Sequence, residues 1–369
     1  MARTMIDINQ SVFQRLLQNI DNEHVHYHLI THGIQRNIIR SLACDENWLQ
    51  NLRIANRVNC FIEKEVIGIE FENEKYVVFY ESDDNLNLPF MHGVIEKQIL
   101  NAGLMTVLFS NEGKLPLKLE IGFEDELINN IFGIEDELYE LALVQKYFQP
   151  VEMWKISDDL KLENNTVLYK LYTGRLLADS GKLNLNFESD TLHHIKSLLE
   201  SSYTDLLSEK VFKAITSTHW VQVFLEFYRC IEFLYKIPYI SEFHGALQSY
   251  DNDGEIMTKI VDNLDKLGWK RKEEDSILNL FNYYDEVGAK KRIHHILFPN
   301  EPMEIDDKVL SNKIARGIYK LRNKLVHWRS SGDMVIEAEY DWNHLTREMI
   351  LFINHYYSFF KYEISCIKM

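Results

Sequence analysis

Residues 307–330 read DKVLSNKIARGIYKLRNKLVHWRS, and this stretch decides how the second half of the chain folds. Ile314, Ile318, Leu321 and Leu325 recur at i, i+4, i+7 and i+11, so one side of a helix would be apolar. The pattern predicts a long amphipathic helix whose apolar side faces a core.

The same stretch is strongly basic. Between positions 311 and 330 it contains six lysine and arginine side chains and no acidic one. Arg322, Asn323 and His327 lie within one and a half helical turns. Asn323 and His327 are at i and i+4 and share a face, and the long side chain of Arg322 can reach the same spot. The three residues are therefore a candidate catalytic set.

Composition limits the possible classes of protein. The chain has 369 residues, which suggests two domains, and an apolar fraction of 46% can form real cores. The four cysteines are far apart, which disfavours a disulfide framework and a structural zinc site. The sequence lacks a signal-peptide pattern and a run of eighteen apolar residues, so we expect a cytoplasmic protein without a membrane span.

Charge is distributed unevenly along the chain. The net charge of −16 alone argues against a nucleic-acid partner. Residues 1–200, however, contain 18 basic and 31 acidic side chains, whereas residues 201–369 contain 22 and 25. The net charges of the two halves are thus −13 and −3. The positive charge of the second half is concentrated in residues 270–272, 290–292 and 307–330. Local patches of this kind decide what a surface binds.

The first half is predicted to be a mixed domain rich in antiparallel sheet. Residues 6–50 have a helical pattern, and from residue 59 to about 190 the apolar residues recur with a period of two. Helical material is expected between 123 and 148. The predicted strands and hairpins lie in 60–82 (turning at Asn73 and Glu74), 104–123 (turning at 111–113), 151–159, 166–177 and 181–189.

The second half is predicted to be a helical bundle. Helical patterns with short polar joints fill 190–217, 219–238, 255–267, 273–287, 289–299, 307–330 and 346–364. The fold class is therefore α+β, with an N-terminal mixed domain over residues 1–195 and an all-α domain over 196–369.

The helical domain resembles the HEPN ribonucleases, in the ApeA-like branch. Residues 318–327, IYKLRNKLVH, carry an arginine, a polar residue and a histidine in the R-x4-H form of that family's signature. Residues 224–235, FLEFYRCIEFLY, are similar to the first core helix of that branch, with Glu232 at its acidic position. The likeness covers about residues 200–365 and leaves out the N-terminal half.

The resemblance implies a metal-independent endoribonuclease without a cofactor, acting as a homodimer through this domain. The ribose 2′-hydroxyl would attack the phosphate and give 2′,3′-cyclic phosphate ends. His327 would transfer protons, Arg322 would bind the phosphate, Asn323 would orient either group, and Glu232 would hold Arg322 or tune His327. The basic side chains expected to bind RNA are Arg316, Lys320, Lys324 and Arg329.

The resemblance also implies a role in anti-phage defence by abortive infection, or as a toxin, with tRNA among the candidate substrates. A phage-derived trigger or an antitoxin would act on the N-terminal domain.

Two alternatives remain open. The domain could be a non-catalytic HEPN scaffold or nucleotide-binding partner of another defence enzyme. Alternatively, a metal-dependent enzyme could use the histidine cluster His24, His26, His28 and His32.

Overall fold

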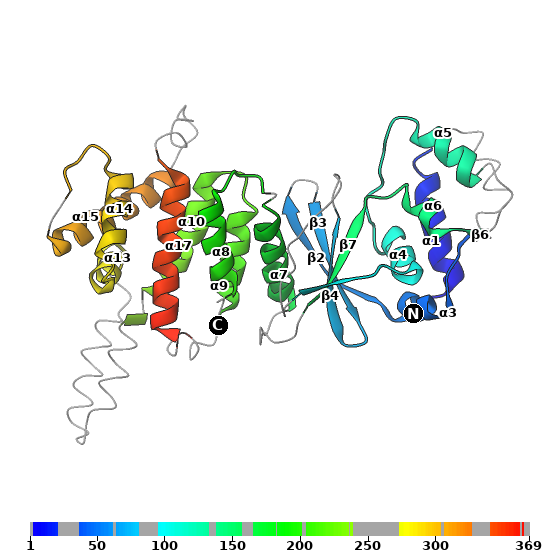
Figure 1. The fold of residues 1–369 in the computed structure, drawn as a ribbon, viewed down its shortest axis with the longest axis horizontal. Helices are drawn as coiled ribbons and strands as arrows, with labels where there is room; N and C mark the ends of the chain where they lie inside the picture. The colour runs from blue at the N-terminus through cyan, green and yellow to red at the C-terminus, as the bar shows by residue number, and fades with distance from the viewer. Residues whose placement is uncertain are drawn as a thin grey trace, which may run out of the picture. The chain divides into compact units, whose positions relative to one another are not determined.

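The computed structural model describes residues 3–20, 37–61, 64–80, 95–132, 138–156, 165–181, 183–200, 204–235, 237–238, 273–303, 306–326, 340–361 and 364. The chain divides into two compact units, Met1–Lys161 and Leu162–Met369. The α+β class is confirmed, with an antiparallel sheet in the first unit and helices in the second (Figure 1). None of the helices that the structure describes combines the length and the apolar character needed to cross a bilayer.

The first unit is built on a five-stranded antiparallel sheet. Its order is β2 (Arg53–Phe61), β3 (Lys64–Phe71), β4 (Glu74–Tyr80), β7 (Val151–Ile156) and β5 (Ile95–Gln98). The turn between β3 and β4 is confirmed at Glu72 and Asn73, one residue before its predicted place, and both residues have positive φ angles of 50° and 67°. Such a pair is typical of tight hairpins, in which the turn twist matches that of the strands.

Short helices and a second, two-stranded sheet complete this unit. The two strands, β1 (Ile38–Ile39) and β6 (Leu138–Tyr139), are parallel. The helices are α1 (Met5–Leu17), α3 (Ala43–Asn51), α4 (Ala102–Phe109), α5 (Phe123–Leu127), which continues into a π-helical turn at Ile128–Phe132, and α6 (Leu141–Gln145). Their apolar faces share one core with the sheet.

Three predicted strand segments are wrong. Residues 104–109 belong to α4, which begins where the Asn101 side chain accepts the Leu104 N–H at 2.9 Å. Residues 166–177 belong to α7 (Asn165–Ser180), and 183–187 contain no strand. All eight residues of α4 are buried, as is most of α7. A segment buried on every side loses the polar face that reveals its period.

The predicted turn after Ser110 is confirmed although its flanking strands are not. A Cβ on Gly113 would lie 2.3 Å from the Leu108 Cα, so only glycine permits this close approach of the chain to α4.

The second unit is a helical bundle, as predicted. Besides α7 it contains α8 (Ser189–Glu200), α9 (Asp205–Ile215), α10 (Trp220–Leu234), α13 (Glu273–Tyr283), α14 (Val287–Leu297), α15 (Asp307–Val326) and α17 (Trp342–Phe359). Helix α17 packs on α8 and α10, and α15 packs on α13 and α14 (Figure 1). Because 166–177 is helical, α7 packs on α8 and α9 and belongs to this unit. The domain boundary expected at 195–196 stays a prediction.

Candidate functional site

Helix α15 carries most of the candidate site. The four predicted apolar residues, Ile314, Ile318, Leu321 and Leu325, are all buried, which confirms the amphipathic helix. At Gly317 a Cβ would lie 2.8 Å from the Phe298 ring, so glycine lets α15 approach the end of α14 closely. This packing positions α15, which carries Arg322 near its C-terminal end.

Arg322 joins three helices. Its Nη2 donates to Glu232 Oε1 on α10 at 3.4 Å, and its Nε lies 3.6 Å from Glu273 Oε1 on α13. Its Nη1 donates to the Asn323 amide oxygen at 3.0 Å. The structure therefore brings together Arg322, Asn323 and Glu232, three of the four predicted catalytic residues, and adds Glu273. We call these four residues the Arg322 cluster.

Tyr228 on α10 and Tyr235, the residue directly after that helix, support the Arg322 cluster. The Tyr228 hydroxyl donates to Glu273 Oε1 at 2.7 Å, and the Tyr235 hydroxyl donates to that of Tyr228 at 3.0 Å. The Arg322 Cζ lies 5.7 Å from the Tyr228 ring centroid, within the range of a cation–π contact. Burial is the main cause that raises the pKa of both phenols well above the usual value, so both stay protonated donors.

The two carboxyl groups of the Arg322 cluster compete for one cation. Burial, then the hydrogen bond to Glu273, and then the charge of Glu273 raise the pKa of Glu232, while the charge of Arg322 lowers it. The side chains are partly exposed, at 34% for Glu232 and 25% for both Glu273 and Arg322. A shared proton relieves the repulsion between two adjacent carboxylates. The pair can therefore accept or release a proton next to a fixed guanidinium.

This pairing predicts how Glu273→Gln changes the pH dependence of stability. The pKa of Glu232 is raised in the folded state. Its contribution to the free energy of unfolding is therefore fully present below the unfolded-state pKa of about 4.3, and it is lost as the pH rises through the folded-state pKa. Without the negative charge of Glu273, Glu232 should ionise with a smaller loss of stability. The stability of Glu273→Gln relative to wild type should thus rise from pH 4 to pH 7, by about 1 kcal/mol at most, since water screens both groups.

Urea denaturation at several pH values measures this difference. Glu274→Gln is the matched control, because Glu274 is the next residue but pairs with the exposed Arg316 at 3.0 Å. For each variant, the difference in the free energy of unfolding from wild type is compared across pH. If this difference changes with pH no more for Glu273→Gln than for Glu274→Gln, the two carboxyl groups do not interact.

Sequence reasoning missed Glu273 and the role of Tyr228. Tyr228 and Glu232 are at i and i+4 on α10, and this shared face could have indicated the tyrosine. The contact from Tyr228 to Glu273 joins residues 45 positions apart, and no local pattern predicts it.

The other predicted site residues fall into two groups. Arg316, Lys320 and Lys324 are exposed on α15, with Arg316 paired to Glu274, and Lys320 has no ion pair or hydrogen bond among the described residues. His327 and Arg329 lie outside the described residues. The chain order places His327 directly after the last residue of α15, Val326.

The alternative metal site cannot be placed, because His24, His26, His28 and His32 also lie outside the described residues. Within the described ranges, no group of three or more histidine, cysteine, aspartate or glutamate side chains is arranged to hold a metal ion.

The basic stretch of α14 divides between the core and the surface. Lys290 is buried and its Nζ lies 2.8 Å from Asp307 Oδ2, and His294 is also buried. Lys291, Arg292 and His295 are exposed.

No protein-family model, no curated protein and no solved structure matches this chain.

Proposed function

We propose that this protein is a metal-independent endoribonuclease of the HEPN type, with its active site at the Arg322 cluster. One observation carries the proposal: Arg322 lies between Glu232 and Glu273, with Asn323 beside it, near the end of α15 where His327 follows in the sequence. A guanidinium, an amide and an ionisable carboxyl pair are groups that a phosphate-cleaving site needs.

The Arg322 guanidinium keeps N–H donors that could bind a phosphate. It has five N–H donors, and the contacts to Glu232, Glu273 and Asn323 engage three of its nitrogens without using every hydrogen. The charge balance depends on the shared proton: two ionised carboxylates and one arginine give −1, whereas one proton on the pair gives zero. A phosphate therefore approaches more favourably when the Glu232–Glu273 pair holds a proton.

The reaction is transesterification followed by release. One group removes the proton from the ribose 2′-oxygen, which attacks the phosphorus, and the bond from phosphorus to the 5′-oxygen breaks. A second group gives a proton to that 5′-oxygen. His327 suits one of these transfers, since its ordinary pKa is near neutral. Arg322 would stabilise the charge that develops on the phosphorane oxygens.

The decisive experiment is cleavage of total RNA and tRNA by purified protein in EDTA, with analysis of the product ends. Cleavage that yields 2′,3′-cyclic phosphate and 5′-hydroxyl ends, and that His327→Ala abolishes, would support the proposal. Cleavage that requires added metal, or that leaves 3′-hydroxyl ends, would contradict it.

A second candidate function is a non-catalytic binding or scaffold module. The observation in its favour is that two carboxyl groups already pair with Arg322, as in a structural ion pair between packed helices. In that case Arg322→Ala would lower the stability of the protein, and the wild type would not cleave RNA in either EDTA or metal.

As part of the proposal, the acidic N-terminal half restrains the nuclease and senses a trigger, and the protein acts in anti-phage defence as a homodimer. Residues 1–200 carry a balance of −13, and like charge near a groove opposes the approach of RNA.

A fragment that begins at residue 162 should therefore cleave RNA faster than the full chain, by about tenfold at low salt. A start at residue 200 would remove α7 and α8, which pack on α9 and α17. The rates of both proteins are compared at equal concentration over a range of salt. Equal rates at every salt concentration would mean that the first unit does not restrain the site.

A further inference from the structure

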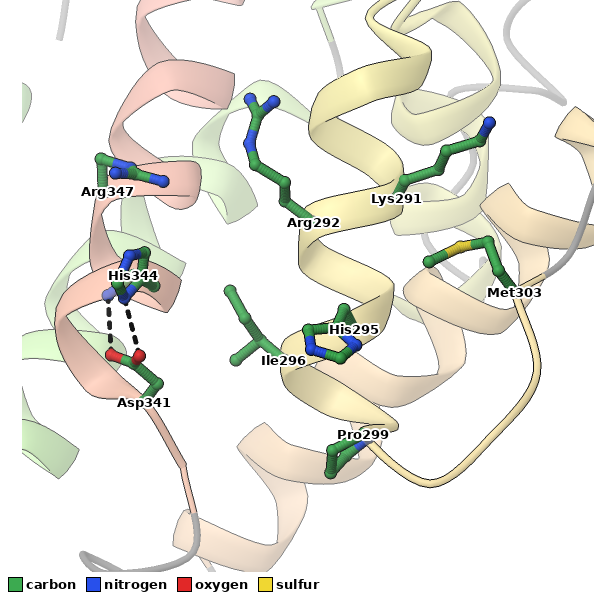
Figure 2. Close-up of a pocket in the computed structure, with 9 residues that line it drawn as sticks. All are labelled: Lys291, Arg292, His295, Ile296, Pro299, Met303, Asp341, His344 and Arg347. Atoms are coloured by element: carbon green, nitrogen blue, oxygen red, sulfur yellow. Dashed lines mark hydrogen bonds and ion pairs between the residues drawn. The ribbon is translucent and has the colours of Figure 1, made fainter.

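A cavity of about 580 Å³ lies on the second unit, away from the residues of the Arg322 cluster. It is lined by α14, the loop that follows α14, and the first turns of α17 (Figure 2). Its volume is in the range of pockets that bind small molecules. The lining residues that matter here are Lys291, Arg292, His295, Ile296, Met303 and Arg347.

Three side chains of α14 offer N–H donors to this cavity. Lys291 and His295 are one turn apart, exposed, and make no hydrogen bond or ion pair with the described residues. Arg292 donates its Nε and Nη2 to Glu348 at 2.7 and 3.1 Å, which leaves its Nη1 available. Because Glu348 is fully buried, it fixes the orientation of the Arg292 guanidinium.

The same cavity also has an apolar part. Ile296 and Pro299 line it between α14 and the start of α17, and Met303 lines it on the other side of α14 (Figure 2). Met303 is 41% exposed, so a bound ligand could cover part of its side chain. A ligand body that covers Met303 would remove apolar surface from water.

Charge in and around the cavity is nearly balanced. Arg347 pairs with Asp190 at 2.9 Å and with Glu348 at 3.2 Å, so its charge is matched, as is that of Arg292. Asp341 accepts from His344 at 2.7 Å. Because charge alone supplies little attraction here, an anion that also carries an apolar body should bind better than a bare inorganic anion.

We propose that this cavity binds a small phosphomonoester with an apolar or aromatic body, with the phosphate on Lys291 and His295 and the body on Met303 (Figure 2). A phosphomonoester has three acceptor oxygens and close to two negative charges at neutral pH, which suits the ammonium of Lys291 and the imidazole N–H of His295. A carboxylate has two oxygens and one charge. The site involves neither Arg322 nor His327, so it goes beyond the proposed nuclease.

The full-length protein is titrated with phenyl phosphate, AMP, benzoate and inorganic phosphate by calorimetry. We expect phenyl phosphate, AMP or both to bind, and benzoate and inorganic phosphate to bind at least about tenfold more weakly. Tighter binding of AMP would assign a nucleotide as the source of the phosphomonoester, and equal binding would assign a simpler phosphorylated compound. Failure of both to bind at about 1 mM, or benzoate binding as tightly as phenyl phosphate, would overturn the proposal.

Two pairs of variants locate the site. Lys291→Glu should weaken the better ligand by about tenfold or more, whereas Lys308→Glu, the same change at an exposed lysine outside the cavity, should alter it by less than about twofold. Met303→Glu should also weaken binding of the better ligand by about tenfold or more. Val309→Glu is its control, since Val309 is also exposed, at 45%, and lies outside the cavity. All four changed side chains are exposed, and circular dichroism checks that each variant folds. Equal effects within both pairs would overturn the assignment.

Discussion

Arg322→Ala is expected to lower the rate of RNA cleavage by at least about 100-fold. The proposed role of Arg322 is to stabilise charge on the phosphorane oxygens, and the loss of one such donor typically costs about 100- to 1000-fold in rate. Rates are measured on a defined RNA under single-turnover conditions, which isolates the chemical step. Arg322→Lys keeps the charge but loses the planar set of donors, so we expect an intermediate rate.

The matched control is Lys313→Ala. Lys313 lies on the same helix and also pairs with a glutamate, Glu301, at 3.1 Å, and it is not among the residues expected to bind RNA. We expect its rate to stay within about threefold of wild type, since partly exposed ion pairs contribute little to stability. Equal losses in Lys313→Ala and Arg322→Ala would show that the loss is not specific to Arg322.

Arg322→Ala also leaves Glu232 and Glu273 next to each other without a cation, so a structural loss must be separated from a chemical one. The double variant Arg322→Met with Glu273→Gln removes one carboxylate together with the guanidinium and restores the local charge balance. If this variant regains the stability of the wild type but not its cleavage, Arg322 acts in the reaction. If it regains cleavage, Arg322 serves only to neutralise the carboxyl pair.

Helices with one solvent-exposed face could be predicted from the sequence. Helices α10 and α15 have apolar stripes at helical spacing. Helices α4 and α7 could not be predicted, because they are buried on nearly every side. For such segments the pattern of apolar residues does not distinguish a helix from a strand.

The site shows the same division between local and long-range information. The grouping of Arg322 with Asn323 is local and could be proposed from the sequence. Glu232 was proposed only through the family resemblance, and its contact with Arg322 spans 90 residues. Glu273 was missed, because what makes it part of the cluster is the packing of α13 on α15. Composition and spacing along the chain do not encode that packing.

The second large effect concerns stability at the start of α15. Lys290 is 1% exposed, and its Nζ lies 3.0 and 2.8 Å from the two carboxylate oxygens of Asp307, which is half exposed. Asp307→Ala leaves a buried ammonium without its partner and removes a negative charge from the first turn of the helix. We expect a loss of about 2–3 kcal/mol in the free energy of unfolding, measured in urea. Asp306→Ala removes only the acceptor of the Val309 N–H and should cost about 1 kcal/mol.

The cause of this loss is tested by removing the ammonium as well. Lys290→Met replaces it with an apolar side chain of similar length, and water can solvate the half-exposed Asp307 that remains, so this change alone should cost less than about 1 kcal/mol. If the unpaired charge causes the loss, Asp307→Ala should cost about 1 kcal/mol or less in the Lys290→Met background. A cost of 2–3 kcal/mol in both backgrounds would instead assign the role of Asp307 to the helix terminus. Because Arg322 lies four turns away on the same helix, the rescued double variant should also cleave RNA at the wild-type rate, which separates the stability of α15 from the chemistry at its other end.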